Sequence, residues 1–374
     1  MSAEFEANCT MPHCQSTNVS VANDSLALTV EETKFPSAEI FKLTLEVLIA
    51  LFGVIGNVFV VAVVSRLGKK KHSSDFYLQN LAVADLGILL LSRPLLAVRE
   101  KEPLNWPFGE FACRFLYPIP EIFYGGSVWF IAVIAIERYR NVVTIKPTSK
   151  IQIKTALKRA KIVATCVWIT SFLIFCLPVY FFFKYRELQN DEKWCGPVWP
   201  SWDRKAVMPR LYVGFLTLFS YILPLAIISF TYLRISYILN RSSSFIKTMR
   251  REEHGETGHK RNIMTIVRSP RLRHNKRAKR ILTPLVVVFA VTMLPLSIFR
   301  LTTVIWPSMG TQEYYGNLLY VVSILVVVNS SVNPVIYSVV SRDFRKGITN
   351  FCLQCCYPAR VKLRSRSFPQ NPSH

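Results

Sequence analysis

Residues 318–340, LLYVVSILVVVNSSVNPVIYSVV, form an apolar stretch without a single charged side chain. An uncharged run of about 20 residues is long enough to cross about 30 Å of hydrocarbon as a helix. Helix is the state expected there, because an open sheet would leave backbone groups unpaired in lipid. Six comparable apolar blocks precede this one, at 40–64, 76–98, 112–143, 162–183, 211–239 and 281–306. The sequence therefore predicts an all-α membrane protein, a seven-transmembrane helix bundle.

Composition and charge exclude the main soluble classes. The chain has 374 residues, 51% of them hydrophobic, and a net charge of +23. Length alone would suggest two soluble domains, but the apolar residues arrive in blocks long enough to span a membrane. Nucleic-acid binding is excluded as well, because the aromatic residues lie inside the apolar blocks instead of beside the basic residues, where stacking platforms would be needed.

The basic residues indicate which gaps between the blocks face the cytoplasm. They concentrate after the first, third, fifth and seventh blocks, whereas the other gaps mix acids with bases. The positive-inside rule then places the N-terminus outside and the C-terminus in the cytoplasm. The layout expected is an extracellular tail over 1–39, a transmembrane domain over 40–341 with a third cytoplasmic loop at about 240–276, an amphipathic helix over 342–356, and a basic, disordered cytoplasmic tail over 357–374.

Modification sites follow from this topology. The N-terminal tail carries three N-x-S/T sequons, at Asn8, Asn18 and Asn23, which predict glycosylation of an extracellular segment. The juxtamembrane cysteines Cys352, Cys355 and Cys356 are expected palmitoylation sites, with simple reduced thiols as the alternative.

The remaining cysteines divide by compartment. Cys166 and Cys176 fall within the apolar blocks and are expected to be packing residues. Four others fall outside, where disulfides persist. A bridge from Cys113 to Cys195 would tie the outer end of the third helix to the loop after the fourth, and Cys9 and Cys14 could close a small loop in the tail.

A segment after the seventh block is predicted to form the short amphipathic eighth helix. Phe344, Ile348, Phe351 and Cys352 share one face at helical spacing. Neighbouring basic residues can then meet lipid headgroups, which makes membrane lipid an expected partner.

Asp85 is an ionisable residue deep in the second block. Such residues are costly in a membrane and mark functional sites by default. A buried carboxylate needs protonation, a partner or a cation. Polar residues in other blocks can complete an oxygen cage around it, and these are Asn57, Ser127, Asn329, Ser330 and Asn333. A protonated carboxyl satisfied by its neighbours remains the alternative.

Two short motifs end the third and seventh blocks. Glu137-Arg138-Tyr139 closes the third block, and Asn333-Pro334-Val335-Ile336-Tyr337 closes the seventh. Proline in a helix frees a carbonyl and makes a deformable point. Each motif is weak evidence alone, but their joint occurrence at the ends of these two blocks is stronger evidence.

Along residues 40–356 the chain resembles the rhodopsin-like (class A) G-protein-coupled receptors. The matching residues follow one another helix by helix: Gly56-Asn57, Leu81-Ala-Val-Ala-Asp85, Trp106-Pro-Phe-Gly109, Cys113, Glu137-Arg-Tyr139, Trp168 with Pro178, Pro224 with Tyr232, Phe289 with Pro295, and Asn333-Pro-Val-Ile-Tyr337. The resemblance implies a receptor of the plasma membrane without enzymatic activity. It also implies an extracellular agonist, a heterotrimeric G protein inside, and arrestin and a receptor kinase as further partners.

Other positions narrow the ligand class. The lysine that binds retinal in opsins is replaced by Val327, and the aspartate that binds amines is replaced by Pro120. The Trp106–Gly109 loop and the tail are most similar to those of peptide or neuropeptide receptors. A small non-amine ligand, or an orphan receptor with constitutive or arrestin-linked signalling, is the alternative. A transporter or channel is the remote one, because the halves show no repeat symmetry.

Site residues are expected in three groups. The ligand pocket is expected to be lined by Glu121, Tyr124, Arg300 and Tyr320 and capped by Trp194 and Trp199, unless Glu121 and Arg300 pair only with each other. An allosteric sodium ion, with no other cofactor, is expected at Asp85, Ser127, Asn329 and Asn333. Coupling and activation are assigned to Glu137, Arg138, Tyr139, Tyr232, Phe289, Met293, Pro295, Asn333, Pro334 and Tyr337.

Two departures from the family pattern concern the sixth block. Met293 stands where the family usually has tryptophan, and residues 275–279 lack the acid that often holds the third-helix arginine. Glu137 is then the obvious partner left for Arg138. Both departures favour detectable signalling without agonist.

Overall fold

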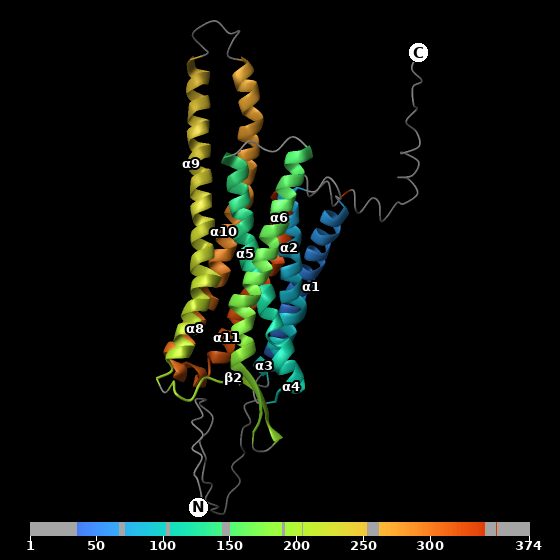
Figure 1. The fold of residues 1–374 in the computed structure, drawn as a ribbon, viewed down its shortest axis with the longest axis vertical. Helices are drawn as coiled ribbons and strands as arrows, with labels where there is room; N and C mark the ends of the chain where they lie inside the picture. The colour runs from blue at the N-terminus through green and yellow to red at the C-terminus, as the bar shows by residue number, and fades with distance from the viewer. Residues whose placement is uncertain are drawn as a thin grey trace, which may run out of the picture.

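The computed structural model describes residues 36–66, 72–101, 105–143, 150–188, 191–203, 205–252, 262–340 and 349. Seven helical spans in this part of the chain are long and apolar enough to cross a membrane, and they stand side by side as a bundle (Figure 1). The predicted fold class is confirmed. The sequons, Cys9, Cys14, most of the expected eighth helix, its cysteines and the C-terminal tail lie outside the described residues.

Several spans consist of more than one helical element. The first is α1 (Pro36–Arg66), and the second joins α2 (Ser73–Gly87), η2 (Ile88–Ser92) and α3 (Arg93–Lys101). The third joins α4 (Gly109–Phe111), η3 (Ala112–Leu116) and α5 (Ile119–Val143), and the fourth joins α6 (Lys150–Ser171), η4 (Phe172–Cys176) and α7 (Leu177–Phe182). The fifth joins α8 (Val207–Thr217), η6 (Leu218–Ile222) and α9 (Leu223–Glu252). The sixth is α10 (Asn262–Ile305), followed by the short η7 (Pro307–Thr311), and the seventh is α11 (Tyr315–Val340).

Three prolines explain most of these breaks. Pro94, Pro178 and Pro224 are each the second residue after a five-residue π-helical turn, η2, η4 and η6 respectively. A proline ring clashes with the carbonyl four residues earlier and donates no N–H. The wider π turn gives that carbonyl room, so the span continues with a local distortion instead of ending.

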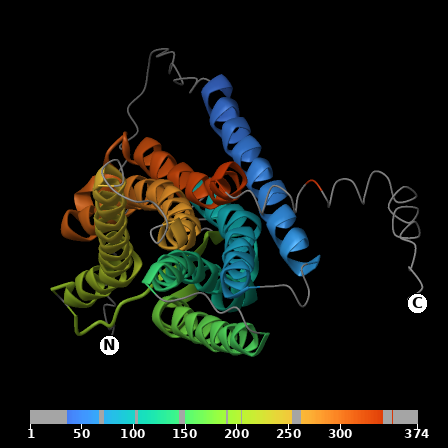
Figure 2. The ribbon, with the colours of Figure 1, turned by 90° about the horizontal axis from the view of Figure 1, so that it is seen from above.

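The third span is the centre of the bundle. α5 packs against α2, α6 and α9, while α1 packs on α2 and α11, and α10 lies between α9 and α11. The view from above shows this arrangement, with α1 on the periphery (Figure 2). Apolar side chains face outward as well as inward, for example Phe41 and Leu51 on α1, which are 67% and 53% exposed. Outward apolar surface of this kind suits hydrocarbon rather than water.

Two helices extend past their apolar blocks. α9 reaches Glu252 and α10 begins at Asn262, whereas the fifth membrane span ends at Arg241 and the sixth begins at Thr283. The segment from 240 to 252 contains no proline or glycine, so nothing in it breaks a helix that is already nucleated. Helix therefore occupies much of the expected third cytoplasmic loop.

Candidate ligand-binding and signalling sites

A disulfide-linked hairpin lies at the end of the bundle that carries α3 and α4 (Figure 1). β1 (Phe183–Glu187) and β2 (Lys193–Pro197) pair antiparallel directly after the fourth span. Cys195 of β2 is bonded to Cys113 of η3, with a Cα–Cα distance of 5.8 Å. The expected bridge is present, and it fixes the hairpin to the third span.

The Trp106–Gly109 loop is hydrogen-bonded to this hairpin. The Trp106 backbone N–H donates to the Lys193 carbonyl at 2.8 Å, and the indole Nε1 donates to the Gly109 carbonyl at 2.9 Å. Gly109 has a φ of +71°, which a side chain would disfavour. The Trp-Pro-Phe-Gly sequence thus forms a turn that anchors the hairpin through a buried indole.

Three expected pocket residues meet between the third and sixth spans. The Arg300 guanidinium of α10 lies over the Tyr124 ring of α5, with its Cζ 5.0 Å from the ring centroid. Glu121 is one helical turn from Tyr124 and interacts electrostatically with Arg300. Tyr212 of α8 is within electrostatic reach of both charged groups. The site therefore combines an acid, a base and two phenol rings from three spans.

The two tryptophans expected as a cap have different positions. Trp199 packs on Phe182 in a tilted arrangement, with ring centroids 4.6 Å apart, and its ring centroid is 5.8 Å from that of Tyr212. It thus adjoins the cluster of Glu121, Tyr124, Tyr212 and Arg300 (the outer cluster). Trp194 packs within the hairpin, where its indole covers Gly196 so closely that a Cβ there would clash.

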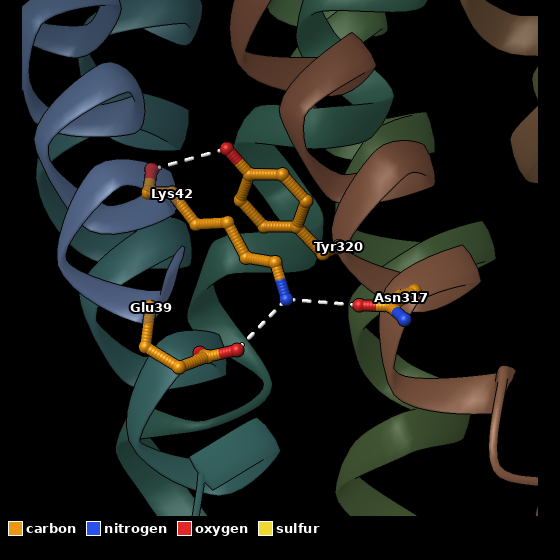
Figure 3. A network of polar contacts seen from close by, with 4 residues as sticks. All are labelled: Glu39, Lys42, Asn317 and Tyr320. Carbon is orange, nitrogen blue, oxygen red and sulfur yellow. Dashed lines mark hydrogen bonds and ion pairs between the residues drawn. The ribbon is translucent and has the colours of Figure 1, made fainter. Parts of the chain in front are cut away.

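Tyr320 belongs to a second polar network, between α1 and α11 (Figure 3). Its hydroxyl donates to the Lys42 carbonyl at 3.0 Å, and Lys42 Nζ lies 5.7 Å from the Tyr320 ring centroid. Lys42 also donates to Glu39 and Asn317, both at 2.8 Å. Tyr320 therefore contacts α1 through these groups, and its place beside Arg300 in one pocket stays a prediction. The rotation of α11 about its axis turns Tyr320 toward α1.

A buried ion pair next to this network escaped the sequence reasoning. Arg93 donates to one carboxylate oxygen of Glu46 through Nε at 2.6 Å and Nη2 at 2.5 Å. The two side chains are only 6% and 12% exposed. Both residues are charges inside apolar blocks, the same signal that singled out Asp85, so sequence reasoning had the means to find them.

The oxygen cage around Asp85 is present in part. Asp85 is fully buried. One carboxylate oxygen accepts from the Ser127 hydroxyl at 2.7 Å and the other from Asn333 Nδ2 at 2.9 Å. Asn329 instead accepts a hydrogen bond from Thr292 of α10, at 3.2 Å. Ser127 and Asn333 therefore join Asp85 directly, whereas Asn329 ties α11 to α10.

Pro334 of the seventh span accounts for a hydrogen bond between the seventh and first spans. Pro334 has no N–H, so the Ser330 carbonyl four residues earlier lacks its helical partner. Asn57 Nδ2 of α1 donates to that carbonyl at 3.1 Å and to the Gly53 carbonyl at 2.9 Å. The Asn-Pro pair thus connects α11 to α1 through the freed carbonyl and to α2 through Asn333.

The inner end of the third span differs from the expectation. Glu137 accepts from the Ser73 hydroxyl at 2.5 Å and lies 3.9 Å from Arg140. Among the described residues Arg138 forms no ion pair with Glu137, and its Nε is buried without a hydrogen-bond partner. Asp75 of α2 exerts the strongest electrostatic influence on Arg138, ahead of Tyr337 and Glu137. An acid of the second span thus contributes to the electrostatic surroundings of Arg138, in addition to Glu137.

The expected activation residues line the interior. Phe289, Met293 and Tyr337 are buried, at 0%, 1% and 3% exposure, and Tyr232 packs against the same core. Tyr221 of η6 stacks on Phe289, with centroids 6.2 Å apart, and its hydroxyl donates to the Ala290 carbonyl at 3.4 Å. Aromatic packing therefore joins the fifth and sixth spans at this depth, and Met293 completes the core beside Pro295.

Known proteins show the same pattern over most of the chain. A family model described as 7 transmembrane receptor (rhodopsin family) matches residues 56–337. Somatostatin receptor type 2 of Mus musculus is 30% identical over 314 residues, which cover 82% of this chain and 75% of the relative. Human galanin receptor type 1 is 27% identical over 304 residues, covering 80% and 78%. Human neuropeptide Y receptor type 4-2 is 28% identical over 333 residues, covering 86% and 81%.

Proposed function

Because the chain belongs to the rhodopsin family of seven-transmembrane receptors, we propose that it binds an extracellular peptide and activates a heterotrimeric G protein. The family resemblance seen in the motifs is confirmed. The protein is a multi-pass receptor of the plasma membrane and not an enzyme, and the transporter or channel alternative is set aside. Relatives named for somatostatin, galanin and neuropeptide Y support a peptide ligand.

The observation that carries the peptide proposal is the outer cluster. Arg300, Glu121 and two phenol rings offer a cation, an anion and aromatic faces within one site. A peptide presents complementary groups at its termini and side chains, whereas a purely apolar ligand would cover both charged groups and offer neither a counter-ion nor a hydrogen bond. The charged pair is half-buried at the outer half of the bundle, where a ligand can desolvate it and exchange one partner for another.

The proposed mechanism is a shift between two populated states. A peptide that contacts Arg300 binds the outer part of α10, and α10 pivots near Pro295 so that its inner end moves outward. Arg138, Tyr232 and Tyr337 then receive the G protein. In the proposed orientation the N-terminus is extracellular and the C-terminus cytoplasmic, as the basic gaps indicate. Arrestin and a receptor kinase are proposed as later partners on the family resemblance.

An allosteric sodium ion at Asp85 is part of the proposal. The donors fit a hard cation, because a carboxylate and hydroxyls are its preferred ligands. Ser127 already contacts Asp85, and the buried Ser330 hydroxyl also interacts with the Asp85 carboxylate. The ion would add to the bonds by which Ser127 and Asn333 already join Asp85 of α2 to α5 and α11, and would thereby favour the inactive state.

A peptide screen tests the function directly. Cells that express the chain are exposed to amidated and free-acid peptides, and calcium and cyclic AMP are recorded. The proposal expects at least one peptide that acts on these cells, not on mock-transfected cells, and loses potency with Arg300→Ala or Glu121→Ala. An agonist of small, non-peptide chemistry that ignores both substitutions would instead support the alternative ligand class.

A further inference from the structure

An apolar groove runs between the third and fifth spans on the side of the bundle that carries the Glu-Arg-Tyr motif. It has a volume of about 480 Å³ and a nearly pure hydrocarbon lining from α5 and α9, made of Ile136, Tyr139, Ala226, Ile227, Phe230 and Thr231. Ile136 and Phe230 are 39% and 58% exposed, and both lie within membrane-spanning segments. The groove therefore opens toward the hydrocarbon of the bilayer.

A positive charge lies beside this groove on α9. Arg234 lies one helical turn after Phe230 on α9, is exposed, and places its guanidinium 6.0 Å from the Phe230 ring centroid. No described carboxylate forms an ion pair with it. A guanidinium at this position is costly unless it reaches the interface and meets water or an anion.

The two features together match one kind of molecule. A phospholipid places an apolar chain and a charged headgroup on either side of the hydrocarbon boundary, which is the order of Phe230 and Arg234 along α9. In the topology proposed above, this end of α9 faces the cytoplasmic leaflet, where the anionic lipids gather. A neutral sterol would fill the groove without using the guanidinium.

We propose that the groove between α5 and α9 binds one acyl chain of an anionic phospholipid, whose headgroup pairs with Arg234. Tyr139, which forms part of the wall, directly follows Arg138 in the sequence. An occupied groove would thus brace the segment of α5 that carries the coupling arginine. The choice of leaflet rests on the topology proposed above. Lipid binding does not require activation of a G protein, so it can be tested without an agonist.

The test uses the full chain in nanodiscs of phosphatidylcholine with a trace of phosphatidylserine that carries a photoreactive group on its acyl chain. Illumination and peptide mapping should locate the label on residues 136–139 or 226–231. Unlabelled phosphatidylserine should compete, and phosphatidylcholine should not. Arg234→Gln should reduce labelling about fivefold, the effect of one basic residue near a charged membrane surface, whereas Arg234→Lys should retain most of it.

Matched variants keep the result interpretable. Arg241→Gln removes another exposed α9 arginine about two turns further along and should leave labelling unchanged. Ala226→Phe fills the groove and should abolish labelling, with thermal stability measured alongside. Equal labelling by a phosphatidylcholine probe, insensitivity to Arg234→Gln, or displacement by cholesterol alone would each overturn the proposal.

Discussion

The ion pair between Glu46 and Arg93 should be a major contributor to the position of α1. Glu46→Gln removes the carboxylate charge and leaves the Arg93 guanidinium, 6% exposed, without its anion. Breaking a buried pair by removing one partner costs about 3–5 kcal/mol. Arg93 makes further interactions, so we expect the lower end of that range. A loss of about 3 kcal/mol lowers the folding equilibrium constant roughly a hundredfold.

Thermal unfolding of the purified receptor, followed by tryptophan fluorescence, measures this loss. Glu39→Gln is the matched control, because Glu39 is 67% exposed in its pair with Lys42 and such pairs contribute at most about 1 kcal/mol. Glu46→Gln should lower the midpoint by several times the shift of the control. The double exchange Glu46→Arg with Arg93→Glu should recover part of the loss. Equal shifts for Glu46→Gln and Glu39→Gln would refute the reasoning.

Three further outcomes follow from the site geometry. Cys113→Ser and Cys195→Ser should each abolish surface expression or agonist binding, since the bond holds the hairpin to the third span; normal binding by both variants would contradict this. Sodium should weaken agonist binding to the parent and leave Asp85→Asn unaffected, as titration of affinity against sodium at constant ionic strength would show. Tyr212→Leu should reduce peptide potency by about two- to tenfold, the range for a lost aromatic contact, and unchanged potency would remove Tyr212 from the site.

The seven spans could be predicted because lipid imposes a simple rule on sequence. A crossing helix must remain apolar for about 20 residues, and residues 318–340 satisfy this without a charge. The outer cysteines were assigned to one compartment for the same reason, and the structure joins Cys113 to Cys195. The cluster at Glu121, Tyr124 and Arg300 was found because polar residues in such blocks are rare.

The neighbours that each face of a membrane helix contacts were harder to predict than the spans themselves. In a soluble helix the apolar stripe reveals which face points inward, but a membrane helix is apolar on its lipid face too. The rotation of α11 about its axis could therefore not be predicted, and the contact of Tyr320 with Lys42 of α1 was missed. The hydrogen bond between Thr292 and Asn329 was missed for the same reason.

The electrostatic surroundings of Arg138 include a residue from the start of the second span. Asp75 lies in the first turn of α2, where its carboxylate accepts from the His72 backbone N–H at 3.0 Å. That role resembles an ordinary helix cap, and nothing in the sequence pattern indicated that the same carboxylate also interacts electrostatically with Arg138. The expectation of basal signalling rested on a missing sixth-span acid, and an acid from the second span weakens it.

The central claim is that a peptide bound at the outer cluster drives nucleotide exchange at the inner end. Purified receptor in nanodiscs, mixed with heterotrimeric G protein and an agonist from the peptide screen, allows GDP release to be timed directly. The account predicts that the peptide accelerates release for the parent, that Arg300→Ala shifts the required peptide concentration upward, and that Arg138→Ala abolishes acceleration while peptide binding persists. Release at the same rate with and without a bound peptide in the parent receptor would contradict the account.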